Sequence, residues 1–220
     1  MPNVDIRTVG ILGAGRVGTA VARQAIKAGY GVLIGTSRPA EDIEMIVDIV
    51  APGAKAVDAA AVVRDSDIVI LAVPLPKYRS LVPAQLAGKT VIDAMNYWAP
   101  TDGHIDAFAG DISSSEIIQR FLPDARLVKS LNHIGYHELE ADDLPLGHPQ
   151  RRALALAGDD EAARRIVSGF IDRLGYDPVD AGELAAGKAF ATGTEIFNGR
   201  HQRAALEQLL GLSARIEELA

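Results

Sequence analysis

The fold is decided by the stretch Val9-Gly10-Ile11-Leu12-Gly13-Ala14-Gly15-Arg16-Val17-Gly18-Thr19-Ala20. An apolar run leads into a Gly-x-Gly-x-x-Gly turn, and a helical pattern follows, which is typical of a dinucleotide-binding unit. We expect Gly13 to allow the tight turn, Gly15 to let the backbone approach a pyrophosphate, and Gly18 to let the helix pack closely. The helix N-terminus would offer the same pyrophosphate free N–H groups and a partial positive charge. The alternative is a glycine-rich turn that binds nothing, but the flanking strand and helix favour a cofactor.

The composition narrows the class of protein. The chain has 220 residues, of which 48% are hydrophobic and 23% charged, enough for one large domain or one domain plus a small one. A net charge of −7 without any basic run argues against a nucleic acid or an anionic membrane as partner. The lack of cysteine excludes disulfides and thiolate chemistry, and it is in keeping with a cytoplasmic location. We expect no signal peptide and no membrane helix, since no apolar run approaches about 18 residues.

The segment after the second expected strand, Gly31 to Gly35, bears on the choice of cofactor. NAD-binding proteins usually place an acidic residue there to hold the ribose 2′-hydroxyl. This chain has Thr36-Ser37-Arg38 instead, and two hydroxyls with a guanidinium suit a 2′-phosphate. The sequence therefore predicts NADP rather than NAD.

Two other interpretations of this turn stay open. Glu41 and Asp42 follow shortly afterwards and would supply the acidic residue if the turn were longer. Ser37, followed by Pro39, would also serve as the cap of the next helix, and capping does not exclude phosphate binding.

The hydrophobic pattern predicts an α/β fold, a Rossmann-type doubly wound parallel sheet with a small C-terminal α/β domain. We place an NADP-binding domain at residues 1–150 and the small domain at 151–220. Ser113 and Glu116 form a capping-box pattern at the start of one helix. Residues 99–111 look irregular, and residues 187–198 have no clear assignment. Strands are expected over 7–12, 31–35, 54–57, 67–73, 90–94, 126–131, 152–158 and 176–181, and helices over 16–28, 39–50, 59–64, 78–86, 113–122, 159–174 and 201–219.

Several candidate site residues stand where expected strands end. In this fold the carboxyl ends of the strands face the ligand. Val73 with Pro74, Asn96 and Asn132 occupy such positions, so we expect them near the cofactor. Tyr97 and Trp98 would either shield a planar ring or cover a loop.

His133 is the titratable candidate at neutral pH, although a histidine that merely orders its loop is the favoured alternative. His133 and His137 are four residues apart, but Gly135 between them disfavours a helical metal site, and Glu138 and Glu140 in the same acidic loop are typical of solvated residues. We therefore predict no metal.

The last helix carries an apolar stripe that would be either core or a homodimer face, formed by Leu206, Leu209, Leu210 and Ile216.

Four features together resemble the NADP oxidoreductases that use the deazaflavin coenzyme F420. They are the Gly-x-Gly-x-x-Gly turn, the Gly35-Thr36-Ser37-Arg38 turn, the strand ends at Asn96 and Asn132, and the run from Gly158-Asp159-Asp160-Glu161 through Gly175-Tyr176-x-Pro178-Val179-Asp180-Ala181-Gly182. The resemblance extends from Val9 to about Thr194. It implies a dinucleotide-binding domain followed by a small domain, with the deazaflavin between them near the nicotinamide.

The resemblance also implies roles for residues at matching positions. The three glycines would hold the pyrophosphate. From their place in the same loop, we expect Ala14, Arg16 and Val17 to contact the cofactor as well, although family members often have other residues there. Residues 36–38 would hold the 2′-phosphate. Val73, Pro74, Asn96 and Asn132 would frame the nicotinamide.

Three functions are compatible with these features. Hydride transfer between two bound rings requires positioning more than acid–base chemistry, in keeping with a chain that shows no catalytic triad. Reduction of a small carbonyl, an imine or a flavin is the alternative; for a carbonyl or an imine, His133 would be the proton donor, with Tyr136 or Tyr97 behind it. The basic residues to consider for a substrate carboxylate are Lys77, Arg79 and Lys129. A module that senses NADPH without turnover is the third.

Overall fold

A six-stranded parallel sheet forms the centre of the molecule, a computed structural model that describes residues 6–108, 110 and 112–212. The strand order is β3-β2-β1-β4-β5-β6, so the chain changes direction across the sheet between β1 and β4. This order is that of the dinucleotide-binding folds, and ligands bind there outside the carboxyl ends of the strands. The strands are β1 (Thr8–Leu12), β2 (Gly31–Gly35), β3 (Ala54–Ala56), β4 (Ile68–Leu71), β5 (Thr90–Asp93) and β6 (Arg126–Lys129).

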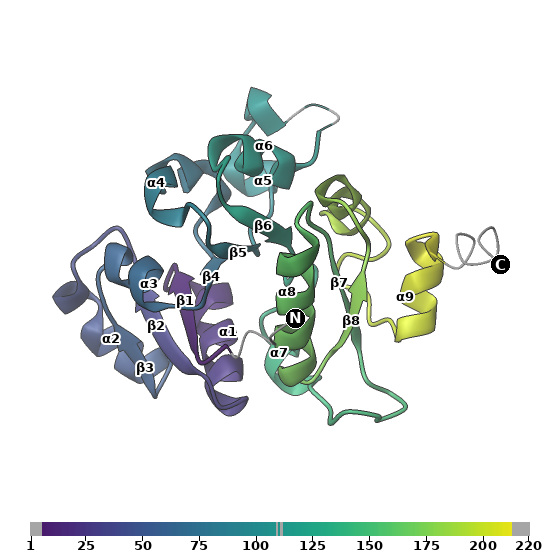
Figure 1. Ribbon diagram of the computed structural model, residues 1–220, viewed down its shortest axis with the longest axis horizontal. Helices are drawn as coiled ribbons and strands as arrows, with labels where there is room; N and C mark the ends of the chain where they lie inside the picture. Colours follow the sequence, from purple (N-terminus) through teal and green to yellow (C-terminus); the bar gives the residue numbers. More distant parts are fainter. Residues whose placement is uncertain (1–5, 109, 111, 213–220) are drawn as a thin grey trace.

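Helices cover both faces of the sheet, which confirms the predicted doubly wound class (Figure 1). One face packs against α1 (Arg16–Lys27), α2 (Glu44–Val50) and α8 (Glu161–Arg173). The other packs against α3 (Ala59–Asp65), α4 (Pro83–Leu86) and α6 (Ser114–Phe121). Successive residues of β4 belong alternately to the two cores, which explains why its sequence is apolar throughout.

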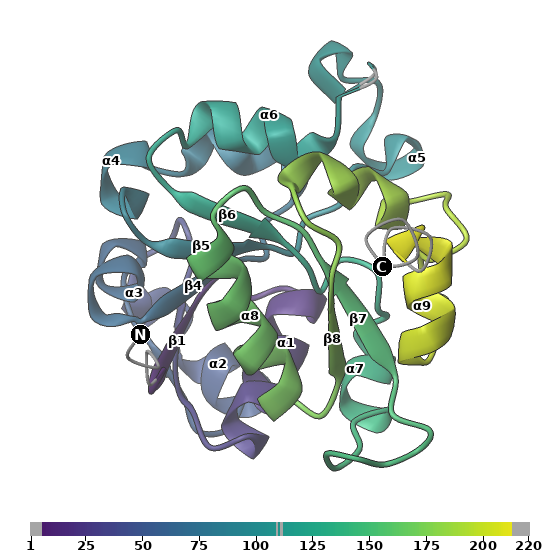
Figure 2. The same ribbon diagram turned by 45° about the vertical axis from the view of Figure 1, so that its right-hand side comes forward.

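The C-terminal residues form a second, two-stranded parallel sheet of β7 (Ala153–Leu156) and β8 (Asp177–Asp180). Helix α8 lies between this small sheet and the large one, beside α1 (Figure 2). Its Phe170 and Ile171 share a hydrophobic core with Val128 of β6. The C-terminal unit is therefore packed tightly onto the large sheet. The domain boundary at residue 150 stays a prediction.

Several expected elements differ from the structure because of proline or of local packing. The last helix, expected over 201–219, spans Arg203–Leu209 within the described residues, before a turn at residues 210–211. The helix expected over 78–86 is wrong: a 3-10 helix, η2 (Leu75–Ser80), precedes the short α4, and prolines occupy the first turn of each. The helix expected over 39–50 begins as a 3-10 turn, η1 (Ala40–Asp42). Segment 99–111 contains two short helices, α5 (Ala99–Asp102) and η3 (Asp106–Phe108), within its described part.

The remaining helices connect the sheet to the C-terminal unit. They are α7 (Glu138–Ala141), the 3-10 helix η4 (Leu184–Phe190) and α9 (Arg203–Leu209). Leu206 of α9 is fully buried in the small core, and Leu209 and Leu210 pack against it. Ile216, the last member of the predicted stripe, lies outside the described residues, and a homodimer stays a prediction. Of the helices described, none combines the length and the apolar character needed to cross a membrane.

Candidate functional site

The glycine turn after β1 has the geometry that the motif predicts. Gly13 has a φ of +124°, and a Cβ there would lie 2.3 Å from the carbonyl oxygen of Ala72. A Cβ on Gly18 would lie 2.1 Å from the carbonyl oxygen of Gly13. At Gly15, by contrast, a Cβ would meet nothing within 4 Å. The protein's own backbone therefore requires two of the glycines, while the third opens onto free space.

The free space above Gly15 adjoins the N-terminus of α1. Gly15 is the N-cap residue, no side chain caps the helix, and its first turn contains no acidic residue. The uncapped N–H groups and the helix dipole therefore favour an anion there. Arg16 is exposed beside this opening, and its Nη1 donates to the Tyr136 hydroxyl at 3.3 Å. Ala14 and Val17 are half-buried and pack against the core.

The turn after β2 presents its polar groups to solvent. The Arg38 N–H donates to the Thr36 hydroxyl at 3.1 Å, while the Ser37 and Arg38 side chains are exposed. The capping role considered for Ser37 is wrong, because no side chain caps η1 and the Ala40 N–H donates to Asp58 instead. Across the described chain, no ion pair engages Arg38. The three residues are thus available to a ligand.

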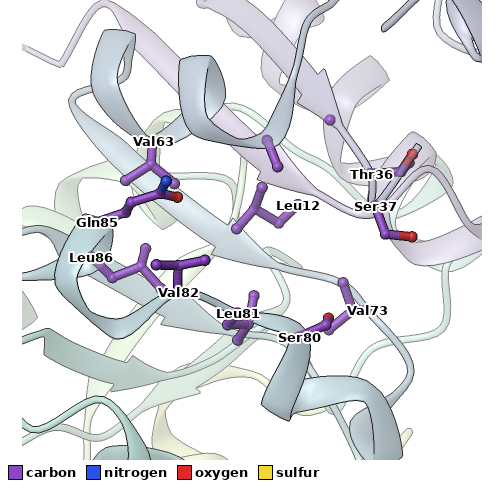
Figure 3. A pocket seen from close by; sticks show the side chains of 12 residues that line it. Leu12, Thr36, Ser37, Val63, Val73, Ser80, Leu81, Val82, Gln85 and Leu86 are labelled. Carbon is purple, nitrogen blue, oxygen red and sulfur yellow. The ribbon is translucent and has the colours of Figure 1, made fainter. Parts of the chain in front are cut away.

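A mostly apolar pocket opens beside this turn, with a volume of about 460 Å³ when the part open to solvent is included (Figure 3). Thr36 and Ser37 lie at one end, and Gln85 and Leu86 at the other. Val73 lines it too, whereas Pro74 is exposed at the start of η2. The pocket residues from α3 and the η2–α4 segment were not predicted from the sequence, in which Val63, Leu81 and Leu86 look like ordinary core positions. The complete lining is Leu12, Gly35, Thr36, Ser37, Ala59, Val63, Val73, Ser80, Leu81, Val82, Gln85 and Leu86.

The structure brings the two strand-end asparagines together. Asn132 Nδ2 donates to Asn96 Oδ1 at 3.1 Å, and Asn96 Nδ2 donates to the Asn132 carbonyl at 2.6 Å. Asn132 is buried and also donates to the Phe190 carbonyl at 3.0 Å, which ties β6 to η4. Asn96 is half-buried. Contact of this pair with a cofactor stays a prediction.

His133 is enclosed between the two units. Its Nε2 accepts from the Ala155 N–H at 3.0 Å, so the proton lies on Nδ1, which faces Asn132 Oδ1 at 3.3 Å. Burial, together with the positive charges of Arg152 and Lys129, lowers the pKa of His133 to about 3. A neutral imidazole with both nitrogens engaged favours the alternative stated above, a histidine that orders its loop.

The nearby acidic loop is engaged in ion pairs. Glu138 pairs with Arg152 at 2.8 Å, and Glu140 pairs with Arg23 at 2.6 Å. The hydrogen bond from Arg23 lowers the pKa of Glu140. The His137 ring packs on Tyr136. Among the described residues, no three His, Asp or Glu side chains come together in a group that could hold a metal ion.

The aromatic and basic residues near the strand ends mostly have structural partners. The Tyr97 hydroxyl donates to the Gly103 carbonyl and accepts from the Ile105 N–H, so Tyr97 covers the loop. Trp98 is 50% exposed. Lys77 is exposed, the Arg79 guanidinium lies over the Tyr78 ring, and Lys129 is buried.

The N-terminal part of the chain is similar to a described family. Residues 8–97 match the family model of the NADP oxidoreductases, coenzyme F420-dependent. The rat metalloreductase STEAP3 is 26% identical over 182 residues, which are 82% of this chain and 35% of that protein. The chain thus spans about a third of the length of the curated relatives it matches.

Two solved structures have the same fold. A hypothetical protein from Sinorhizobium meliloti is 30% identical, with a TM-score of 0.77 over 90% of this chain and 96% of that chain. A protein from Arthrobacter sp. FB24, described as an F420-dependent NADP-reductase, is 22% identical, with a TM-score of 0.71 over 96% of this chain and 93% of that chain. The second likeness concerns the fold alone.

Proposed function

The chain belongs to the family of coenzyme F420-dependent NADP oxidoreductases, and we propose that it exchanges hydride between NADP(H) and the deazaflavin F420. The open space above Gly15, beside an uncapped helix N-terminus, is the observation that carries the cofactor assignment. A bound pyrophosphate accepts from N–H groups of that turn, and the missing Cβ allows the backbone to approach it.

We assign the adenosine part of the cofactor to the pocket in Figure 3. Its walls are aliphatic, from residues such as Leu12, Val63 and Leu81, and they suit the faces of a flat ring. The hydroxyls of Thr36 and Ser37 lie at the end of the pocket next to the Arg38 turn. A 2′-phosphate placed there receives hydrogen bonds from both hydroxyls and from the guanidinium, which an NADH ribose does not require.

The nicotinamide end of the cofactor lies toward the carboxyl ends of β4, β5 and β6. Val73 and Pro74 flank it on one side, and the Asn96–Asn132 pair on the other. Bound NADPH supplies the hydride, and the protein's part is to hold the two rings in register and to keep water out.

The state of His133 favours a ring as the hydride partner. Reduction of a carbonyl or an imine requires a proton donor beside the substrate. His133, the candidate for that role, is buried, and its low pKa keeps it unprotonated at neutral pH. Hydride transfer to a deazaflavin does not require such a donor within the described site.

Spectrophotometry of the protein with NADPH and oxidised F420 tests this proposal. We expect both chromophores to decrease in step, and NADH in place of NADPH to give little reaction. Binding of NADPH without reduction of the deazaflavin would overturn the F420 assignment and would direct attention to flavin, carbonyl or imine acceptors, or to a sensor. Failure to bind NADPH would overturn the cofactor assignment itself.

A further inference from the structure

A buried charged pair lies at the carboxyl ends of β5 and β6, the strands toward which we assign the nicotinamide end of the proposed site. Asp93 ends β5 and Lys129 ends β6, and the two residues are register partners in the sheet. Asp93 is 0% exposed and Lys129 2% exposed. Lys129 Nζ is 3.4 Å from Asp93 Oδ2. The stem of Lys129 is covered by η4, since a Cβ on Gly187 would lie 3.1 Å from its Cγ.

Both members of the pair bind the backbone of Met95. Lys129 Nζ donates to the Met95 carbonyl, and the Met95 N–H donates to Asp93 Oδ1 at 3.0 Å. The Ser115 hydroxyl of α6 holds the other carboxylate oxygen of Asp93 at 2.7 Å. The peptide groups on each side of Met95 are therefore fixed from below by side chains of two strands and a helix.

Met95 is followed at once by Asn96, and Lys129 precedes Asn132 by three residues. The two asparagines bind each other, so the charged pair anchors both halves of that arrangement. Leu131, which lies between Lys129 and Asn132 in the chain, has a φ of +62°, a conformation that residues other than glycine rarely adopt. Such a backbone persists only where its surroundings determine it strongly.

Stability alone does not account for this pair. Removing two charged groups from water opposes the gain from their attraction, and well-packed apolar residues often serve equally well at such positions. Burial indeed lowers the pKa of Lys129, while Asp93 opposes the shift. What an apolar pair cannot supply is a donor for the Met95 carbonyl and an acceptor for its N–H.

We propose that Lys129 and Asp93 are positioning residues, which set the end of β5 so that Asn96 and Asn132 meet the nicotinamide half of NADP(H). This inference rests on the proposed cofactor site. It concerns only one end of that site, because the pocket and the Arg38 turn lie at the ends of other strands. The adenosine half and the nicotinamide half of the cofactor should therefore respond differently when the pair is changed.

Two ligands separate these halves: adenosine 2′,5′-bisphosphate, which lacks the nicotinamide, and NADPH. For Lys129→Met we expect unchanged affinity for the bisphosphate and about tenfold weaker binding of NADPH, the effect of losing one ordered polar contact. The double variant Asp93→Asn with Lys129→Met leaves no unpaired buried charge. It should fold even where the single variant does not, and should show the same split between the two ligands.

Arg151→Met is the matched control. Arg151 is 2% exposed, lies just before the first residue of β7, and is paired with Asp172 and Asp177. Its loss should therefore lower the melting temperature and leave both affinities unchanged. Equal weakening of the two ligands in the Lys129 variants, or no weakening of NADPH, would overturn the positioning role. If the unchanged protein bound neither ligand, the proposed function would fail first, and the inference with it.

Discussion

The three glycines of the first turn make a prediction in which stability and binding separate. Gly15→Ala adds a methyl group where nothing lies within 4 Å, at a φ of −82° that alanine adopts readily. The loss of a preferred N-cap residue costs about 0.5–1 kcal/mol. The lower entropy of the unfolded chain offsets this by about 0.4–1 kcal/mol. We therefore expect the free energy of unfolding to change by less than about 0.5 kcal/mol.

The same methyl group projects into the space assigned to the pyrophosphate. It would keep at least one backbone N–H from reaching a charged oxygen, a contact worth about 1.5–3 kcal/mol. NADPH should then bind roughly 10- to 100-fold more weakly. Gly18→Ala provides the contrast, because its Cβ would lie 2.1 Å from the Gly13 carbonyl oxygen and should destabilise the fold by about 1–3 kcal/mol or more.

Urea unfolding and titration of NADPH fluorescence measure the two effects separately. Binding of NADPH by Gly15→Ala as tight as by the unchanged protein would contradict the assignment of the pyrophosphate to this space. A loss of stability in Gly15→Ala as large as in Gly18→Ala would contradict the separate role given to Gly15.

Three further perturbations test other parts of the account. Arg38→Ala should weaken NADPH binding by about 10- to 100-fold and leave NADH nearly unaffected; equal losses for both in parallel titrations would contradict the 2′-phosphate assignment. Because the pKa of His133 is about 3 in the folded protein against 6.5 for the free side chain, unfolding takes up a proton below about pH 6.5. The free energy of unfolding should therefore decrease as the pH falls from about 6.5 toward about 3, by up to about 1.4 kcal/mol per pH unit. His133→Gln should lose this component of the pH dependence in urea titrations, whereas the exposed His104→Gln should keep it. Ser113→Ala removes half of an observed capping box with Glu116 and should cost about 1 kcal/mol on thermal unfolding, with no change in NADPH affinity; no loss of stability would show that the cap contributes little.

Local patterns predicted the sheet and the glycine turn because their causes are local. Each central strand is a short apolar run buried on both faces, so its place along the chain is visible without knowledge of its neighbours. The capping box at Ser113 was likewise predictable, since both partners lie within one turn.

The pocket could not be predicted in the same way. Val63 and Leu86 look like ordinary core residues in the sequence, and only the folding of α3 and α4 against the end of β1 opens a space between them. The expected helix over 78–86 failed for a related reason: Pro83 begins a new short helix, and the preceding turn is stabilised by contacts such as that of the buried Tyr78 with Phe108 and Phe121.

The environment of His133 depends on contacts across the chain. Its partner Ala155 lies on β7, and Asn132 beside it binds the Phe190 carbonyl of η4. A histidine at a strand end has the same appearance in sequence whether it faces a substrate or a second sheet. The structure distinguishes the two by burial and by the direction of the Nε2 hydrogen bond.

The preference between the two nicotinamide cofactors tests the central claim most directly. Parallel fluorescence titrations of the unchanged protein with NADPH and NADH compare two ligands that differ only in the 2′-phosphate. With hydroxyls at Thr36 and Ser37, a guanidinium at Arg38 and no acidic residue directly after β2, we expect NADPH to bind roughly 100-fold or more tightly than NADH. Equal affinities, or tighter binding of NADH, would contradict the account.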